Sequence, residues 1–253
     1  WPADWGDMRH ARRALAKGPD VAPHQVWCTA ADPGVVVGAD GTTYVASGKD
    51  VRALDGAGTE LWKVTIPSSV RQVFLAPGGL FVLGTGHLYV LGGGGSVLFS
   101  EATGALAGGV IGEDGALYLA FKKASAVGFP HTELSVQQRA LDGAGLPAAT
   151  AWTVLAFNAT ADTTTTGLIT LRPVPMPGSG VLVSGLDLTD TTSQTRWSAH
   201  GSDGAKLWQG SRSGSVSDAP PASDGALSLF GRVSMLGVRS FAADSRGWAE
   251  GSG

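Results

Sequence analysis

The residues that could act as metal ligands, acids or bases are spread along this chain without forming a recognisable site. None of the five histidines forms a pair such as HExxH, which would set two imidazoles on one face of a helix. Asp187 and Asp190, in the stretch DLTD, have no third ligand at loop spacing and no glycine for the sharp turn of a calcium loop. We therefore predict turn roles for both aspartates and surface or loop positions for the histidines, which are His10, His24, His87, His131 and His200.

Motifs for nucleotide binding and nucleophilic catalysis are incomplete as well. GTGHLY (84–89) lacks the third glycine of a dinucleotide fingerprint, and GSRSG (210–214) has Arg212 where a nucleophile elbow needs serine. The single cysteine, Cys28, excludes an internal disulfide and a cysteine-clustered zinc site, and we expect it to pack as a small hydrophobic residue. The sequence thus predicts no catalytic residue, no cofactor, no metal ligand and no enzymatic activity.

The composition indicates a turn-rich, mostly β chain. It has 253 residues, 38 of them glycine, with 43% hydrophobic and 15% charged residues, so it can bury a core while turning often. The formal net charge of −3 gives no basic face for nucleic acid. No apolar run approaches the roughly 18–20 residues that span a bilayer. Because the chain begins at Trp1, we expect a processed or trimmed product, and the sequence leaves a lipid anchor open.

A repeated unit organises the chain. Each copy has a glycine turn, a strand, a second glycine turn and a closing strand with an aromatic residue, and four strands of about 5–6 residues with turns need about 40 residues. One such unit cannot bury both faces alone, so we expect the copies to pack radially. The copies span 39–62, 77–99, 113–152, 178–208 and 223–248, and their longer spacings predict insertions, as long loops or extended hairpins, at 122–138 and 158–180.

The aromatic residues that close the units should wedge between neighbouring sheets, where a smaller side chain would leave a void. They are Trp62, Phe99, Trp152, Trp208 and Trp248, and a cofactor-stacking tryptophan is the alternative. Trp27 is an additional aromatic with no repeat before it, and we predict a strand at 24–29, within a ring-closing segment 24–34, that pairs beside the last unit. Tight turns that need positive φ are predicted at Gly41, Gly56, Gly79, Gly115, Gly143 and Gly225.

The pattern of an Asp-Gly turn, a TYV or LYL strand, ALDGAG and a tryptophan resembles the PQQ-like repeat of bacterial β-propellers. The opening WPADWGDMRHARRA, followed by HQVWCTAADPGVVVGADGTTYV, is similar to the leader of extracytoplasmic members. The family includes quinoprotein dehydrogenases and the outer-membrane assembly lipoprotein. The resemblance implies an all-β propeller that is periplasmic, outer-membrane-associated or extracellular. The number of repeats, with the additional aromatic Trp27, predicts five to six four-stranded blades, and the length predicts one domain, 1–253. It does not extend to the quinone site, since Cys28 alone cannot form the vicinal disulfide of those dehydrogenases.

A basic segment precedes the repeats. DMRHARRALAK (7–17) sets Met8, Ala11 and Leu15 at helical spacing, which predicts a short helix in an N-terminal arm, 1–23, docked on the ring. Its outward residues are Arg9, Arg12, Arg13 and Lys17. They form either a solvated helix face or a surface that binds an acidic partner, a surface polymer or lipid head groups.

Two functions follow from this reading. The first is a non-enzymatic extracytoplasmic propeller that binds or scaffolds protein partners in an envelope or surface assembly. The second is an enzyme, or a protein that binds a small molecule or carbohydrate, with a site at the propeller axis assembled from different blades and therefore invisible to local motifs.

Overall fold

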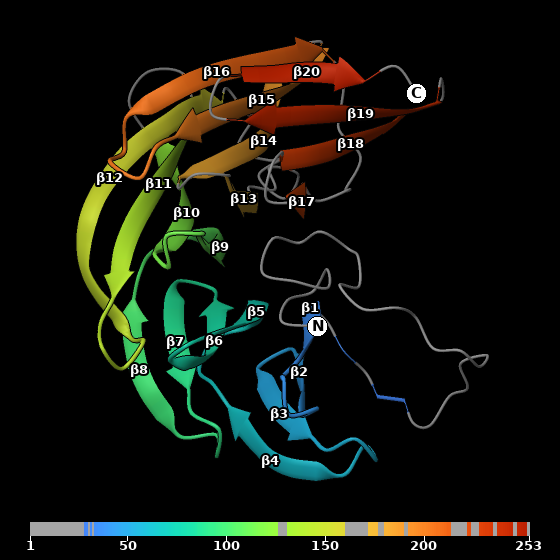
Figure 1. The fold of residues 1–253 in the computed structure, drawn as a ribbon, viewed down its shortest axis with the longest axis vertical. Coiled ribbons are helices and arrows are strands. Elements are labelled where there is room, and N and C mark those ends of the chain that lie inside the picture. Colours follow the sequence, from blue (N-terminus) through green and yellow to red (C-terminus); the bar gives the residue numbers. More distant parts are fainter. Residues whose placement is uncertain are drawn as a thin grey trace. The chain divides into compact units, whose positions relative to one another are not determined.

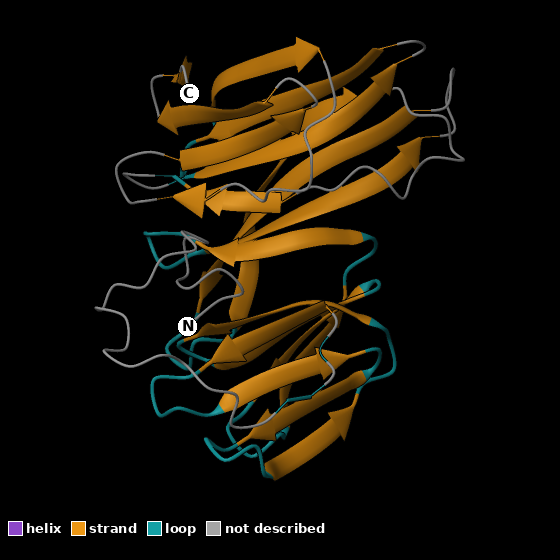
Figure 2. Cartoon of the chain, turned by 90° about the vertical axis from the view of Figure 1, so that its right-hand side faces the viewer, coloured by secondary structure: helices purple, strands orange, loops and turns teal. Residues whose placement is uncertain are grey.

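In the computed structural model of the chain, the described residues are 28–29, 31, 33–125, 131–159, 172–176, 180–189, 192–213, 222–223, 228–234, 237–244 and 247–251. The predicted N-terminal arm, 1–23, lies outside them, and so do Trp27, His10, His24, Asp190 and Gly225. The described residues contain strands and connecting loops and no helix, as Figure 2 shows.

The strands of the described residues form five four-stranded antiparallel sheets, each made of consecutive strands in sequence order (Figure 1). Sheet 1 contains β1 (Pro33–Val37), β2 (Thr43–Ser47), β3 (Asp50–Leu54) and β4 (Glu60–Thr65). Sheet 2 contains β5 (Val70–Ala76), β6 (Gly79–Gly84), β7 (His87–Leu91) and β8 (Val97–Ala102). Sheet 3 contains β9 (Leu106–Ile111), β10 (Leu117–Ser125), β11 (His131–Leu141) and β12 (Pro147–Ala159). Sheet 4 contains β13 (Arg172–Pro175), β14 (Val181–Thr189), β15 (Thr192–His200) and β16 (Lys206–Ser213). Sheet 5 contains β17 (Ala222–Ser223), β18 (Ser228–Ser234), β19 (Gly237–Asp244) and β20 (Gly247–Gly251).

The chain divides into two compact units. The first comprises sheets 1 and 2 together with the turn Asp142–Leu146, and the second comprises sheets 3, 4 and 5. In the first unit, alternate residues of sheets 1 and 2 point into one shared core, as the two-residue period of a strand requires. Its buried members include Val36, Ala46, Val51, Val73, Leu80, Val82, Tyr89 and Leu91.

The second unit has a corresponding core between sheets 3 and 4. Val181 and Val183 of β14 pack with buried residues of sheet 3, among them Tyr118, Leu134 and Val136. The intervening residue of β14, Leu182, points to the opposite face, where it packs with Met176, Trp197, Ala199 and Trp208. Sheet 4 is therefore apolar on both faces, as a sheet between two neighbours must be.

The two predicted insertions have different outcomes. Residues 122–138 contain an extended hairpin, because β10 and β11 remain paired as far as Ser125 and His131. The second insertion, 158–180, contains β13, the first strand of sheet 4, which the sequence did not predict. Its sequence RPVP has two prolines, and proline is tolerated in a sheet at an edge such as the one that β13 occupies.

Residues 24–27 of the predicted strand 24–29 lie outside the described residues, and its last two residues, Cys28 and Thr29, belong to no strand. The first strand among the described residues begins at Pro33, within the predicted ring-closing segment 24–34. Cys28 is a free thiol and is exposed, so the expectation that it packs as a buried hydrophobic residue is wrong. Cys28 is not part of a strand, so no sheet holds its side chain in a core.

Candidate functional site

The closing tryptophan of sheet 1 docks on a turn of sheet 2. Trp62 of β4 donates a hydrogen bond from its indole Nε1 to the carbonyl oxygen of Gly93, at 2.5 Å, in the turn between β7 and β8. The ring lies over Gly95 of the same turn, where a Cβ would come within 3.0 Å of two ring carbons. Only glycine leaves room for the ring at this distance, so Trp62 and the turn are fitted to each other.

The second unit repeats this arrangement. Trp152 of β12 donates from its indole Nε1 to the carbonyl oxygen of Ser202, at 2.8 Å, in the turn between β15 and β16. A Cβ on Gly204 would lie 2.9 Å from the Trp152 ring. At both positions the indole lies against a turn of the next sheet and makes a hydrogen bond that the sequence did not suggest.

Each docked tryptophan also has a tyrosine neighbour in its own sheet. Tyr44 and Trp62 face each other across Ala53 in adjoining strands, with ring centroids 5.9 Å apart and tilted by 49°. Tyr118 and Trp152 make the same contact at 5.9 Å and 56°. Such tilted pairs contribute beyond the area that they bury.

The other closing aromatics occupy corresponding strands. Phe99 lies on β8 opposite Val90, and Trp208 lies on β16 opposite Ala199 within the core of sheet 4. Trp248 lies on β20 opposite Ala243. These positions match the predicted repeat, while a cofactor-stacking role for any of the tryptophans stays a prediction that the structure does not address.

Among the described residues, six turns share one five-residue geometry that orders the strand ends. The first N–H donates to the fifth carbonyl, the fourth N–H donates to the first carbonyl, and the fourth residue is a glycine with positive φ. The turns span 38–42, 55–59, 92–96, 112–116, 142–146 and 201–205. Their fourth residues are Gly41, Gly58, Gly95, Gly115, Gly145 and Gly204.

This geometry corrects two of the predicted turn glycines. Gly41, Gly79 and Gly115 have the expected positive φ, but in DGAGT and DGAGL the positive φ falls on Gly58 and Gly145. Gly56 and Gly143 are the second residues of their turns and need no special conformation. The reason is that Asp55 and Asp142 are the first residues of their turns, whereas Asp40 and Asp114 are third residues.

The aspartates of the repeats are used by their own turns. As a third residue, the Asp40 carboxylate accepts the Thr42 N–H at 3.0 Å and the Thr42 hydroxyl at 2.9 Å. These two bonds hold the pKa of Asp40 below its ordinary value. As a first residue, the Asp55 carboxylate accepts the N–H groups of Ala57 and Thr59 instead. Asp114, Asp142 and Asp203 make the corresponding backbone bonds.

Asp114 is also the centre of a small polar cluster in sheet 3. The Tyr118 hydroxyl donates to the Asp114 carboxylate at 2.7 Å. The Gln138 amide donates to the Asp114 carboxylate at 3.3 Å and to the Tyr118 hydroxyl at 3.0 Å. Burial, followed by the bond to Asp114, raises the pKa of Tyr118. The phenol therefore stays neutral at physiological pH and serves as a hydrogen-bond donor.

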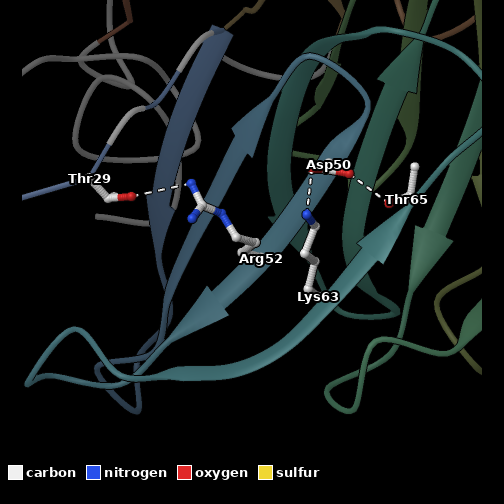
Figure 3. A network of polar contacts seen from close by, with 5 residues as sticks. All are labelled: Thr29, Asp50, Arg52, Lys63 and Thr65. Carbon is white, nitrogen blue, oxygen red and sulfur yellow. Dashed lines mark hydrogen bonds and ion pairs between the residues drawn. The ribbon is translucent and has the colours of Figure 1, made fainter.

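One face of sheet 1 carries a second polar network (Figure 3). The Asp50 carboxylate accepts a hydrogen bond from the Thr65 hydroxyl at 2.6 Å and pairs with the Lys63 ammonium at 2.7 Å. These contacts lower the pKa of Asp50, and the contact with Lys63 has the largest effect. Arg52, on the same strand, donates to the Thr29 hydroxyl at 3.2 Å, which ties the segment before β1 to the sheet.

The predicted positions of the histidines and Asp187 are partly wrong. His87 stacks on Tyr89 with centroids 5.8 Å apart, and His131 begins β11. His200 was predicted at the surface, but it is 1% exposed and hydrogen-bonded to Ser198. Asp187 lies within β14 opposite Gln194 and not in a turn, because the β14–β15 hairpin is longer than the repeat suggested. Among the described residues no group of three or more histidine, cysteine or carboxylate side chains could hold a metal ion.

The comparisons with known proteins bear on the fold. No family model and no curated protein sequence matches the chain. The WD40 domain of Pan2 from Neurospora crassa is similar in structure, with a TM-score of 0.52 and 10% identity over 85% of this chain and 63% of that one. A protein of unknown function from Bacteroides caccae gives a TM-score of 0.50 and 10% identity over 76% of this chain and 65% of that one. The chain thus spans slightly less than two thirds of the length of either.

These likenesses define the class of protein. WD40 domains are β-propellers of four-stranded blades, and the five consecutive four-stranded sheets of this chain have the β-propeller fold. BamB from Moraxella catarrhalis also matches, over 86% of this chain and 83% of that one, but at a TM-score of 0.44 and 16% identity. The β-propeller prediction is confirmed, and the finer assignment to PQQ-like repeats stays a prediction. No helix among the described residues has the length and apolar character of a membrane span.

Proposed function

We propose that this chain is a non-enzymatic propeller that binds a protein partner and acts as a scaffold. The observation that carries the proposal is a leucine exposed at the same place on three outermost strands. Leu61, Leu98 and Leu207 are 55%, 49% and 42% exposed. Each precedes a closing aromatic residue and is the additional residue of a β-bulge.

The bulge explains why these leucines point outward. Trp62 pairs with Ala53 and Glu60 pairs with Leu54, so Leu61 has no residue opposite it in β3. A bulge re-aims a side chain and interrupts an edge strand, which disfavours pairing with another edge. The outermost strand therefore presents a side chain, and not a free edge, for an apolar contact with a partner.

The polar groups of the repeats support a non-enzymatic role. The carboxylates of Asp40, Asp55, Asp114, Asp142 and Asp203 each accept backbone N–H groups of their own turns. A carboxylate committed to ordering a turn is poorly placed to accept protons from a substrate. In this account these aspartates are architectural.

The finer parts of the proposal rest on the sequence. We infer that the chain is a single propeller domain of PQQ-like repeats, 1–253, working outside the cytoplasm in an envelope or surface assembly, on the strength of the ALDGAG and TYV motifs. The basic residues Arg9, Arg12, Arg13 and Lys17 are the proposed contact with an acidic surface of that partner. Substituting glutamine for the three arginines should weaken the complex and reduce its dependence on salt.

The experiment is recovery of a stoichiometric complex from the native source by mild extraction, followed by native mass spectrometry. The variant Leu61→Ser/Leu98→Ser should lose the partner while keeping its thermal stability, because both side chains are exposed. Ser100→Asn, an exposed polar change on β8, is the matched control and should keep the partner. A partner retained equally by all three proteins would refute a role for the leucines, and a monomer in every extract would refute the scaffold.

A further inference from the structure

His200 occupies a position where the other sheets have leucine. The residue directly before the third turn of a sheet is Leu54 in sheet 1, Leu91 in sheet 2 and Leu141 in sheet 3, but His200 in sheet 4. Leu91 is fully buried in the core between sheets 1 and 2. The histidine thus replaces an apolar core residue of the repeat.

The imidazole lies on the face of sheet 4 that packs against sheet 3. His200 pairs with Val181 and Ser198 pairs with Val183, and both valines belong to the core shared with sheet 3. Ser198 and His200 are 0% and 1% exposed, and the Ser198 hydroxyl lies 2.8 Å from His200 Nε2. Among the described residues, Nδ1 is buried without a hydrogen-bond partner.

This arrangement suits a neutral imidazole and penalises a charged one. A neutral ring has one N–H, whereas a protonated ring donates from both nitrogens. Nδ1 has no hydrogen-bond partner, so protonation would leave a donor of a buried cationic group unsatisfied, and the nearby Gly204 backbone offsets only part of the cost of burial. Beyond the Gly204 backbone, the neighbouring elements do not compensate this charge. Val181 of β14 is apolar, Pro175 of β13 pairs with Val181, and Lys206 of β16 is the cross-strand partner of His200.

The other charged groups nearby also do not compensate a charge on the His200 imidazole. Asp203, in the turn after His200, accepts the Ala205 N–H, and Arg196 lies on the same strand as the histidine. Trp152 is the residue of β12 at this turn and carries no charge. No carboxylate among the described residues is bonded to the imidazole.

His200 is joined directly to the docking turn for Trp152. Gly201, the next residue, makes both ring-closing hydrogen bonds of the turn 201–205. That turn accepts the Trp152 indole at Ser202 and fits its ring at Gly204. Any movement of His200 toward water would displace the turn on which sheet 3 docks.

We propose that His200 makes the junction between sheets 3 and 4 an acid-sensitive switch, in which protonation releases the 201–205 turn from Trp152. The proposal stands apart from the scaffold function. It also predicts that the homologous junction between sheets 1 and 2, which has Leu91 in this place, does not respond to acid.

Burial lowers the pKa of His200 from its ordinary value of 6.5. The Gly204 backbone opposes this shift, and the charge of Lys206 adds to it. Because the pKa of His200 is lowered while the 201–205 turn is docked on Trp152, His200 binds a proton more readily once the turn is released. The closed junction is therefore fully stable above pH 6.5 and weakens as the pH falls from there toward the lowered pKa.

The test is amide hydrogen exchange by NMR at pH 7.5 and 5.0, corrected for intrinsic exchange. Gly201 and Gly204 donate the two turn bonds in sheet 4, and Gly92 and Gly95 donate the same bonds in sheet 2. We expect protection of Gly201 and Gly204 to fall at least about tenfold at pH 5.0 relative to Gly92 and Gly95. The variant His200→Leu, which copies sheet 2, should abolish this difference.

Since His200→Leu leaves Ser198 without its partner and could impair folding, His200→Gln provides a second neutral side chain. An equal fall in protection at both turns, or a pH response that persists in either neutral variant, would overturn the proposal. So would a His200 imidazole that titrates in the folded protein at or above 6.5.

Discussion

Trp62 on β4 lies against Gly95 of the β7–β8 turn, closely enough that a Cβ on the glycine would stand 3.0 Å from the indole ring. The contact joins two consecutive sheets, because the Trp62 ring fills the space that a side chain at Gly95 would occupy. We predict that Gly95→Ala destabilises the protein by more than 1 kcal/mol, since the new methyl meets the ring and the residue has φ of 82°.

Gly94 offers the matched control for this change. It belongs to the same turn, a Cβ at this position would meet no atom within 4 Å, and the residue needs no positive φ. Urea denaturation should show Gly94→Ala close to wild type. Equal losses for both variants would mean that the Trp62 contact has no special role.

The hydrogen bond of the second docking tryptophan can be separated from its packing. Trp152→Phe retains most of the ring but removes the donor to Ser202, and we expect a loss of about 1 kcal/mol in the free energy of unfolding. Trp152→Ala also empties the space over Gly204, with a loss of about 3–5 kcal/mol. A phenylalanine variant as unstable as the alanine variant would contradict this division.

The corrected turn register gives a prediction about sheet 1. Gly58 has φ of 83° and should not tolerate alanine, whereas Gly56 has open space and an ordinary conformation. Thermal unfolding should therefore show a lower Tm for Gly58→Ala and little change for Gly56→Ala. The reverse order would restore the register expected from the Asp-Gly dipeptide.

The Asp50–Lys63 pair sets a pH dependence for sheet 1. Because the folded-state pKa of Asp50 is lowered, its contribution to stability is present above its ordinary value of 3.8 and is lost as the pH falls through the lowered value. In Lys63→Met, the carboxyl resonance of Asp50 should titrate at higher pH than in wild type, as followed by NMR. The shift should shrink in high salt, since the pair is partly exposed. An unchanged titration in the variant would show that Lys63 does not lower the pKa of Asp50, and would leave the shift to Thr65 and Arg52.

The sequence predicted the sheets well because their signals are local. Asp-Gly turns and closing aromatics recur within each unit, so five units and the positions of Trp62 and Trp152 could be found without a structure. It failed at Gly56 because DGAG contains two glycines, and the hydrogen bonds of the turn decide which one takes positive φ. The burial of His200 could have been inferred only from the leucine at the same place in the other repeats. The contacts that bury His200 come from sheet 3, which is distant in sequence.

A tryptophan of one sheet joins a glycine turn of the next sheet in both compact units. The most direct measurement is solvent exchange of the indole N–H protons of Trp62 and Trp152 by NMR, with Trp62→Phe and Trp152→Phe to assign the signals. We predict that both protons exchange far more slowly than a free indole, because they are bonded to Gly93 and Ser202. Exchange at the rate of a free indole at both positions would contradict the account.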